Sequence, residues 1–340
     1  MAQERVVTTD CGVHDRPALP DRSPVSIIVS THNRVHCLRQ VLACLVWLFA
    51  AELDAGSAEI LVFDDASTDE TAAVCAQYQH HVCYLSTQRQ VGCIEARRRL
   101  MRQAKGEYVL QLDDDSCLLD PEALDRVRML FASRPDCAII AANIASPRLP
   151  SGYAPTGIEP MAVGSFIGCG CAFRASAVRR IGSYPAFLAG YGAEEIALSL
   201  LVLDRGYQIL FLPSLRVHHA LDISQRPEGR RRGTSFANEA VTIIALYPAW
   251  LVLPALAYKT ATYLLYNARQ RSLRGFLGVQ RELPSRLRHA LRARAAVRHS
   301  TIRLFYTLRG TFERVRTDHA QCVTSRERWP DIGGILSTAP

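Results

Sequence analysis

The sequence predicts an α/β fold in which a mixed, mostly parallel sheet is flanked by helices. Four short apolar runs with strand character alternate with helical stretches, and they lie at Val25–Ser30, Ile60–Phe63, Val82–Leu85 and Tyr108–Gln111. Polar clusters follow the first, second and fourth runs. The first of these clusters, Thr31–Arg34, contains no glycine, and this excludes the dinucleotide-binding fold, which needs a Gly-x-Gly-x-x-Gly turn there.

Composition limits the class of protein and its partners. The chain has 340 residues, of which 49% are hydrophobic and 21% charged, as expected for one large globular domain with an appendage. The net charge is +8, and arginine dominates after Gln225. Such a basic segment suits an anionic membrane surface or a phosphate-bearing substrate, whereas no stacking motif supports nucleic acid. The 11 cysteines form no Cys-x-x-Cys pair, so we expect reduced thiols and a cytoplasmic location.

The elements follow in order. A helix from Cys37 to Ala50 succeeds the first strand, and Ser67 and Glu70 have the spacing of a capping box for the helix after the second strand. A helix over Gly92–Ala104 precedes the fourth strand. In a parallel sheet the carboxyl ends of the strands meet at one edge, so the polar clusters after these strands should converge there.

Three consecutive aspartates follow the fourth strand. Asp113 and Asp115 are two residues apart, so in an extended segment their side chains share a face. Hard oxygen ligands of this kind suit Mg²⁺ or Mn²⁺. The alternative is a helix cap near Pro121 or a solvated turn, but the neighbouring clusters favour a metal site.

These motifs, in their order and spacing, resemble family 2 glycosyltransferases with the GT-A (Rossmann-like) fold. The matching stretches are Ser26–Arg34, Asp64–Asp69, Ala96-Arg97, Gly106–Tyr108, Leu112–Asp115 and Gly190–Glu195. The resemblance implies inverting transfer of a sugar from a UDP- or dTDP-sugar to an acceptor hydroxyl, assisted by Mg²⁺ or Mn²⁺. The acceptor would be a glycan, a lipid-linked saccharide or a small molecule.

The resemblance also implies roles for individual residues. Those that would bind the nucleotide-sugar are Thr31, Asn33, Arg34, Asp64, Asp65, Arg97, Asp113 and Asp114. Asp113 and Asp115 would hold the metal together with His218, although the sequence does not separate His218 from His219 and plain packing is the alternative for both. Glu195 would be the general base, with Glu194 as the fallback. Helix-dipole stabilisation would equally place acids at this helix start.

Two departures from the family pattern keep another class open. Ala197 and Leu201 stand where the family has an acid and an arginine, and Arg98 to Leu100 replace Asn-x-Gly. The rival interpretation is therefore a non-catalytic GT-A module that binds a nucleotide or a partner. A nucleotidyltransferase would need a glycine-rich basic loop after the first strand, which this chain lacks.

The domain plan is read from composition. We expect a flexible leader (1–23), a GT-A catalytic domain (24–222) with a nucleotide-sugar half (24–116) and an acceptor half (117–222), a basic loop (223–235), a helical, basic extension (236–320) and a tail (321–340). Pro248 and Pro254 should divide the uncharged stretch from Ala240 to Tyr258 into two short helices. The extension would attach peripherally to an anionic membrane at its inner face or, alternatively, pack as a lid on the core.

Overall fold

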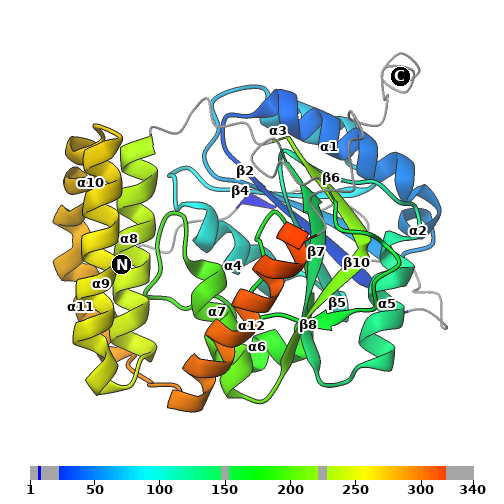
Figure 1. Cartoon of the computed structure of the whole chain (residues 1–340). Coiled ribbons are helices and arrows are strands. Elements are labelled where there is room, and N and C mark those ends of the chain that lie inside the picture. The colour runs from blue at the N-terminus through cyan, green and yellow to red at the C-terminus, as the bar shows by residue number, and fades with distance from the viewer. Residues whose placement is uncertain (1–6, 9–22, 147–152, 221–227, 319–340) are drawn as a thin grey trace.

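The computed structural model describes residues 7–8, 23–146, 153–220 and 228–318 (Figure 1). They form a ten-stranded sheet with the strand order β1-β4-β3-β2-β5-β9-β7-β10-β6, and β8 pairs with β10. The strands are β1 (Val7–Thr8), β2 (Val25–Thr31), β3 (Ala58–Asp64), β4 (Val82–Ser86), β5 (Tyr108–Asp113), β6 (Ser116–Leu118), β7 (Cys137–Ala145), β8 (Met161–Ala162), β9 (Gly170–Arg174) and β10 (Gln208–His219). Strands β2, β3, β4, β5, β7 and β10 share one direction, which confirms the predicted mixed, mostly parallel sheet.

Helices cover both faces of this sheet. The helices of the described residues are α1 (Val35–Leu48), α2 (Ala50–Asp54), α3 (Thr71–Gln77), α4 (Cys93–Gln103), α5 (Ala123–Ser133), α6 (Ala175–Arg180), α7 (Glu194–Asp204), α8 (Glu228–Leu246), α9 (Ala249–Arg269), α10 (Leu273–Val279), α11 (Leu283–Arg292) and α12 (His299–Asp318), with a 3₁₀ turn at Gln280–Glu282. Because side chains alternate along a strand, Ile27 and Val29 join one hydrophobic core with α1, α3 and α5, while Ile28 joins the other with α4, α6 and α7.

The strand register brings the predicted polar clusters to one edge. Thr31 at the end of β2 lies opposite Asp64 of β3, and Ser30 lies opposite Asp113 of β5. The long strand β10 reaches the same edge from the other half of the sheet, where His219 pairs with Ser116 of β6. The chain direction therefore collects residues from four strands beside the turn between β5 and β6.

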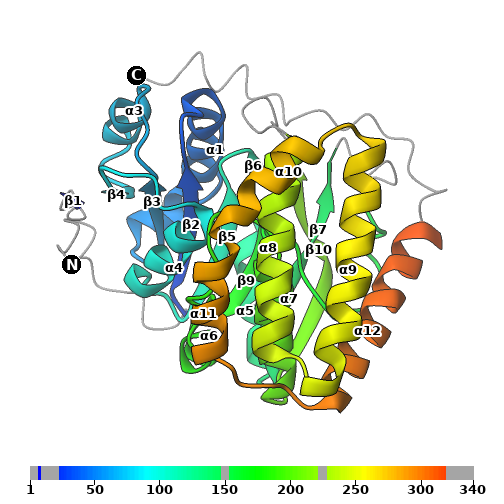
Figure 2. The same ribbon diagram turned by 90° about the vertical axis from the view of Figure 1, so that its left-hand side faces the viewer.

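A layer of helices formed by α8, α9, α10 and α11 stands beside the sheet, and Figure 2 views it face on. The expected basic loop at 223–235 is wrong from Glu228 onward, because α8 begins there. The glycine at 229 is used for packing: a Cβ would lie 2.6 Å from Ser272 O, where α8 meets the start of α10. Residues 221–227 lie outside the described part of the chain.

The prediction that two prolines interrupt the helical stretch is confirmed for Pro248 and wrong for Pro254. Pro248 separates α8 from α9, but Pro254 lies inside α9, so the two helices are long, with 19 and 21 residues. None of the helices within the described ranges is long and apolar enough to cross a membrane.

Two other expectations need correction. Cys44 of α1 and Cys117 of β6 form a disulfide, because α1 packs against the neighbouring strand, whereas reduced thiols were predicted. Within the expected leader, Val7–Thr8 form β1, which pairs with β4. Most of the leader and all of the predicted tail lie outside the described residues. The boundaries of the two catalytic halves remain predictions.

Candidate active site

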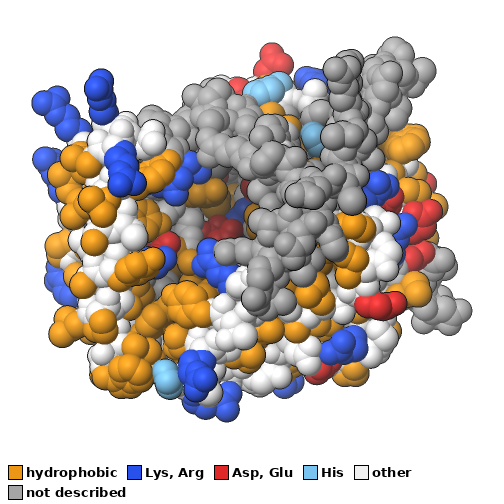
Figure 3. All heavy atoms as spheres, in the orientation of Figure 1, with side chains coloured by type: hydrophobic (Ala, Val, Ile, Leu, Met, Phe, Trp, Pro, Cys, Tyr) orange, Lys and Arg blue, Asp and Glu red, His pale blue; other side chains and the backbone are white. Residues whose placement is uncertain are grey.

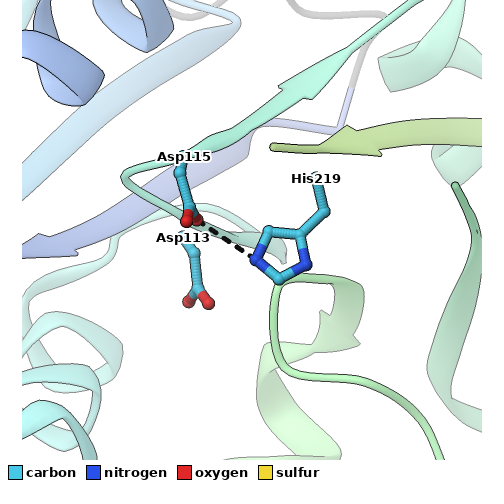
Figure 4. Close-up of side chains that lie close together, drawn as sticks. All are labelled: Asp113, Asp115 and His219. Atoms are coloured by element: carbon cyan, nitrogen blue, oxygen red, sulfur yellow. Dashed lines mark ion pairs between the residues drawn. The ribbon is translucent and has the colours of Figure 1, made fainter. Parts of the chain in front are cut away.

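Three side chains that suit a divalent cation lie together at the sheet edge. Asp113 ends β5, Asp115 stands in the turn that follows, and His219 ends β10 (Figure 4). One ligand atom of each residue lies within 4.8 Å of the others. The His219 Nε2 atom is 3.2 Å from Asp115 Oδ1, and the backbone N–H of Ala220 donates to Asp115 O, which fixes the end of β10 against this turn.

The histidine in this group is His219, whereas the sequence prediction named His218. Successive side chains of a strand point to opposite faces, so only one member of a neighbouring pair can face the aspartates. The antiparallel pairing of β10 with β6 puts His219 opposite Ser116, next to Asp115, and His218 opposite Cys117. The geometry therefore moves the predicted ligand by one residue.

Two buried arginines meet the aspartates. Arg34, which directly precedes α1, donates from Nη1 to Asp114 Oδ1 and from Nη2 to Asp115 Oδ2, both at 2.5 Å. Thr31 Oγ1 also donates to Asp114 Oδ2 at 2.8 Å. Arg97 of α4 donates to Asp113 Oδ1 at 2.5 Å. The structure thus brings Thr31, Arg34 and Arg97 into direct contact with the aspartates.

Burial and these partners act differently on two neighbouring carboxyls. Burial raises the pKa of Asp114 to about 7, although the Arg34 guanidinium opposes this. Burial also disfavours the charge of Asp115, but the hydrogen bond and charge of His219, together with Arg34, hold the pKa of Asp115 below its ordinary value. The same pairing raises the pKa of His219 against its burial. Asp115 is therefore the ionised carboxylate that His219 contacts.

Two other residues predicted to bind the nucleotide-sugar, Asp64 and Asp65, stabilise the turns next to the aspartates. Asp64 accepts from Ser67 N at 2.8 Å and from the Tyr84 hydroxyl at 2.6 Å. Asp65 accepts from the backbone N–H groups of Val91 at 2.6 Å and Gly92 at 2.8 Å, and burial raises the pKa of Asp65. These contacts tie β3 to the starts of α3 and α4. They are not contacts with the aspartate cluster.

Asn33 belongs to the same turns, and its neighbours correct the predicted capping box. Asn33 has a φ of 51°, its N–H donates to Ser67 Oγ at 2.9 Å, and its Oδ1 accepts from Thr68 N at 2.7 Å. Because Ser67 is engaged with Asn33, it does not cap α3. The N-cap residue is Glu70, whose side chain makes no cap hydrogen bond, and Asp69 Oδ1 accepts at 3.1 Å from the N–H of Thr71, the first residue of the helix.

The two predicted catalytic glutamates open α7 in different surroundings. Glu194 is buried and accepts from Arg97 Nη1 at 2.7 Å. Glu195 accepts from the backbone N–H of Gly168 at 3.2 Å. Burial and the neighbouring Glu194 raise the pKa of Glu195 to about 8, and Arg97 opposes this shift. Arg97 therefore links Glu194 at the start of α7 to Asp113 at the end of β5.

Several contributors were not predicted as site residues. Gly168 is placed so that a Cβ would lie 2.8 Å from Arg97 Nη1 and 3.0 Å from Glu195 Oε1. Gln111 Nε2 donates to Gly168 O at 2.8 Å, and the Tyr184 hydroxyl donates to Gln111 Oε1 at 3.0 Å. Gln111 did leave a signal, because it is a polar residue inside an apolar strand and stands two positions before Asp113.

The positions that depart from the family pattern belong to the hydrophobic core. Ala197 is fully buried, and the half-buried Leu201 packs against the same core as α4 and α6. On the surface, acidic and basic side chains lie in a hollow beside the helical layer (Figure 3).

Known sequences resemble the part of the chain that contains the three aspartates. Residues 26–157 match the family model described as Glycosyl transferase family 2. A protein of Haemophilus influenzae described as an uncharacterized glycosyltransferase is 28% identical over 116 residues. This match spans 34% of the present chain and 37% of that relative, so little more than a third of the relative's length is covered. The predicted resemblance is confirmed.

Comparison with solved structures confirms the fold. The mannosyltransferase PcManGT from Pyrobaculum calidifontis, in complex with GDP-Man and Mn²⁺, has a TM-score of 0.52 at 18% identity, over 91% of this chain and 90% of that one. TarS 1–349 of S. aureus, in complex with UDP-GlcNAc, has a TM-score of 0.53 at 16% identity, over 88% of each chain. GalNAc-T7 with UDP, GalNAc and Mn²⁺ has a TM-score of 0.53 at 16% identity, over 66% of this chain and 49% of that one. At these identities the likeness shows the shared GT-A fold alone.

Proposed function

We propose that the chain transfers a sugar from a nucleoside diphosphate donor, of the UDP- or dTDP-sugar class, to an acceptor hydroxyl with inversion. The match of residues 26–157 to the glycosyl transferase family 2 model and the GT-A fold support this proposal. The observation that carries this proposal is the joining of two groups by one side chain. Arg97 contacts Asp113 of the metal-ligating group and Glu194 beside the proposed base.

The ligand atoms of Asp113, Asp115 and His219 suit a divalent cation. Asp113 and Asp115 offer hard oxygen ligands and His219 an imidazole nitrogen, a set that suits Mn²⁺, and Mg²⁺ is the alternative. A bound cation would neutralise the negative charge that develops on the departing diphosphate.

The acceptor step uses Glu195. The acceptor hydroxyl gives its proton to the carboxylate of Glu195 while its oxygen attacks the anomeric carbon, and the bond from that carbon to the diphosphate oxygen breaks. A single displacement of this kind inverts the anomeric centre and needs no covalent intermediate with the protein. Glu194 is less suited to take the proton, because Arg97 already holds it as an ion pair.

Calorimetry with UDP, dTDP and GDP, each with and without Mn²⁺, tests the donor site. We expect metal-dependent binding of one nucleotide to the wild type and its loss in Asp115→Ala. Asp120→Asn is the matched control, because Asp120 pairs with Arg216 at 2.6 Å and with Arg126 at 3.1 Å, away from the cluster. No binding of any nucleotide in either condition would overturn the proposal. Nucleotide binding without release of nucleotide from any sugar donor would favour the non-catalytic module.

A further inference from the structure

The outward side of α9 is apolar along its whole length. Trp250, Leu253, Tyr258 and Leu265 are exposed by 63%, 77%, 67% and 59%. At about 100° per residue, their spacing puts all four on one side of the helix, which is about 30 Å long. The lysine of this helix, Lys259, lies on the opposite side and binds Glu239 of α8 at 2.6 Å.

The inward side of α9 is covered by the protein itself. Leu251, Val252 and Leu256 pack against the core, and the Tyr263 hydroxyl donates to Glu239 at 2.9 Å. A helix with apolar side chains on both its inward and its outward side normally has both sides covered. A large exposed apolar patch marks an interaction site.

The charge of this region indicates which kind of partner would bind the exposed apolar side of α9. From Ala249 to Arg309 the sequence has 12 basic residues and one acidic residue, Glu282. Exposed arginines stand at the end of α9 and in the segments that follow it in the chain, namely α10, the 3₁₀ turn and α11: Arg269, Arg271, Arg274, Arg281, Arg288 and Arg292. Hydrophobic side chains cover much of this region of the surface, and basic side chains stand at its upper edge (Figure 3). The combination suits an anionic surface with an apolar interior.

We propose that this face of α9 docks on an anionic lipid surface, with Trp250 and Leu253 entering the apolar layer and the arginines at the phosphates. Aromatic and aliphatic side chains on one helical side, with basic residues around it, lie in the plane of a lipid interface. The inference concerns a partner, and it stands whether or not the proposed sugar transfer is correct.

Co-sedimentation with phosphatidylcholine vesicles, with and without phosphatidylglycerol, tests this docking face. We expect binding that requires phosphatidylglycerol and that falls by about tenfold or more in W250S/L253S, since two exposed apolar side chains are lost. Trp47→Ser is the matched control, because Trp47 is 60% exposed on α1 and should leave binding unchanged. The proposal is overturned if the wild type binds no anionic vesicle or if W250S/L253S binds as the wild type does. It is equally overturned if size-exclusion chromatography shows a dimer that W250S/L253S abolishes.

A second observation concerns the turn that leads into the two glutamates. Gly190, Gly192 and Ala193 have φ values of 70°, 91° and 65°, so this turn runs through the left-handed region three times within four residues. Ala193, which directly precedes Glu194, adopts this conformation although it is not glycine, at a conformational cost. Something must hold the turn in place.

Asn238 of α8 is fully buried and holds this turn. Its Nδ2 donates to the carbonyl oxygens of Ala189 at 3.0 Å, Tyr191 at 3.2 Å and Gly192 at 2.7 Å, and its Oδ1 accepts from Ala189 N at 3.2 Å. Arg286 of α11 reaches in and donates to Asn238 Oδ1 and, at 3.5 Å, to Ala189 O. Both side chains come from the helical layer, beyond the residues that match the family model.

We infer that Asn238, supported by Arg286, is a positioning residue that holds Glu195 at the acceptor side. The inference rests on the proposed role of Glu195. The helical layer would then help to set the position of the acceptor, because it holds the turn at 189–193 from which α7 begins.

Asn238→Ala tests the clamp, and Asn267→Ala is its matched control. Asn267 is equally buried in the same layer, but it bonds to Tyr263 and Ser272. We expect hydrogen exchange over residues 189–195 to accelerate about tenfold in Asn238→Ala, kcat to fall about tenfold and nucleotide affinity to stay within about twofold. Asn267→Ala should change none of these. Unchanged exchange in Asn238→Ala overturns the clamp itself, whereas faster exchange with unchanged kcat overturns the link to Glu195.

Discussion

On the donor side, Asp115 has the Arg34 guanidinium and the His219 imidazole within hydrogen-bonding distance, whereas on the acceptor side Glu195 accepts its hydrogen bond from the backbone of Gly168. Asp115 is buried and Glu195 is half-buried, and their pKa values move in opposite directions. The difference shows that burial alone does not decide charge in this site. The cationic partners keep Asp115 ionised, which suits its proposed role as a metal ligand, while Glu195 retains a proton affinity that suits its proposed role as a base.

The largest effect should come from replacing each of the two glutamates, Glu195 and Glu194, by glutamine. Glu195→Gln removes the proton acceptor and should lower kcat by about a thousandfold, with nucleotide affinity unchanged. Glu194→Gln should lower the melting temperature more and kcat less, because it breaks the buried pair with Arg97. Single-turnover rates and thermal unfolding of both variants check this. Equal kcat losses in the two variants would contradict the distinction between them.

The pH dependence sharpens the same comparison. Glu195 must be ionised to accept a proton, and its pKa is raised to about 8, so the base is progressively lost as the pH falls below that value. We expect kcat/KM for sugar transfer to rise about tenfold per pH unit from pH 6 and to level off above about pH 8. A profile that is flat across this range would show that another group takes the proton.

The donor side could be predicted further from the sequence than the acceptor side. Thr31, Asp64 and Asp113 sit at the ends of neighbouring parallel strands, and the topology of such a sheet brings strand ends together. The choice between His218 and His219 needed the register of β10 against β6, which the sequence does not contain. The sequence around Asn238 did not indicate its role, because its partners, the backbone of the turn and the side chain of Arg286, lie 46 to 49 residues away.

The next prediction concerns the choice between the two histidines. His219→Ala should weaken Mn²⁺ affinity on the order of tenfold, because the imidazole nearest Asp115 is removed. His218→Ala, on the opposite face of the same strand, is the control and should leave Mn²⁺ affinity unchanged. Calorimetric titration of Mn²⁺ in the presence of nucleotide measures both. A loss of affinity confined to His218→Ala would restore the original assignment.

The smallest effect should come from one methyl group placed between the two sides. In Gly168→Ala the new Cβ would lie 2.8 Å from Arg97 Nη1 and 3.0 Å from Glu195 Oε1, so both side chains must shift by a few tenths of an ångström. Because these are the ends of side chains, the shift is inexpensive for stability, but it moves the base, and we expect kcat to fall about fivefold with little change in melting temperature. Gly157→Ala is the control, since a Cβ there meets no atom within 4 Å. If Gly168→Ala instead lowered nucleotide affinity with kcat unchanged, the methyl group would act on the aspartates through Arg97. Gly168 would then belong functionally with the aspartates and not with Glu195.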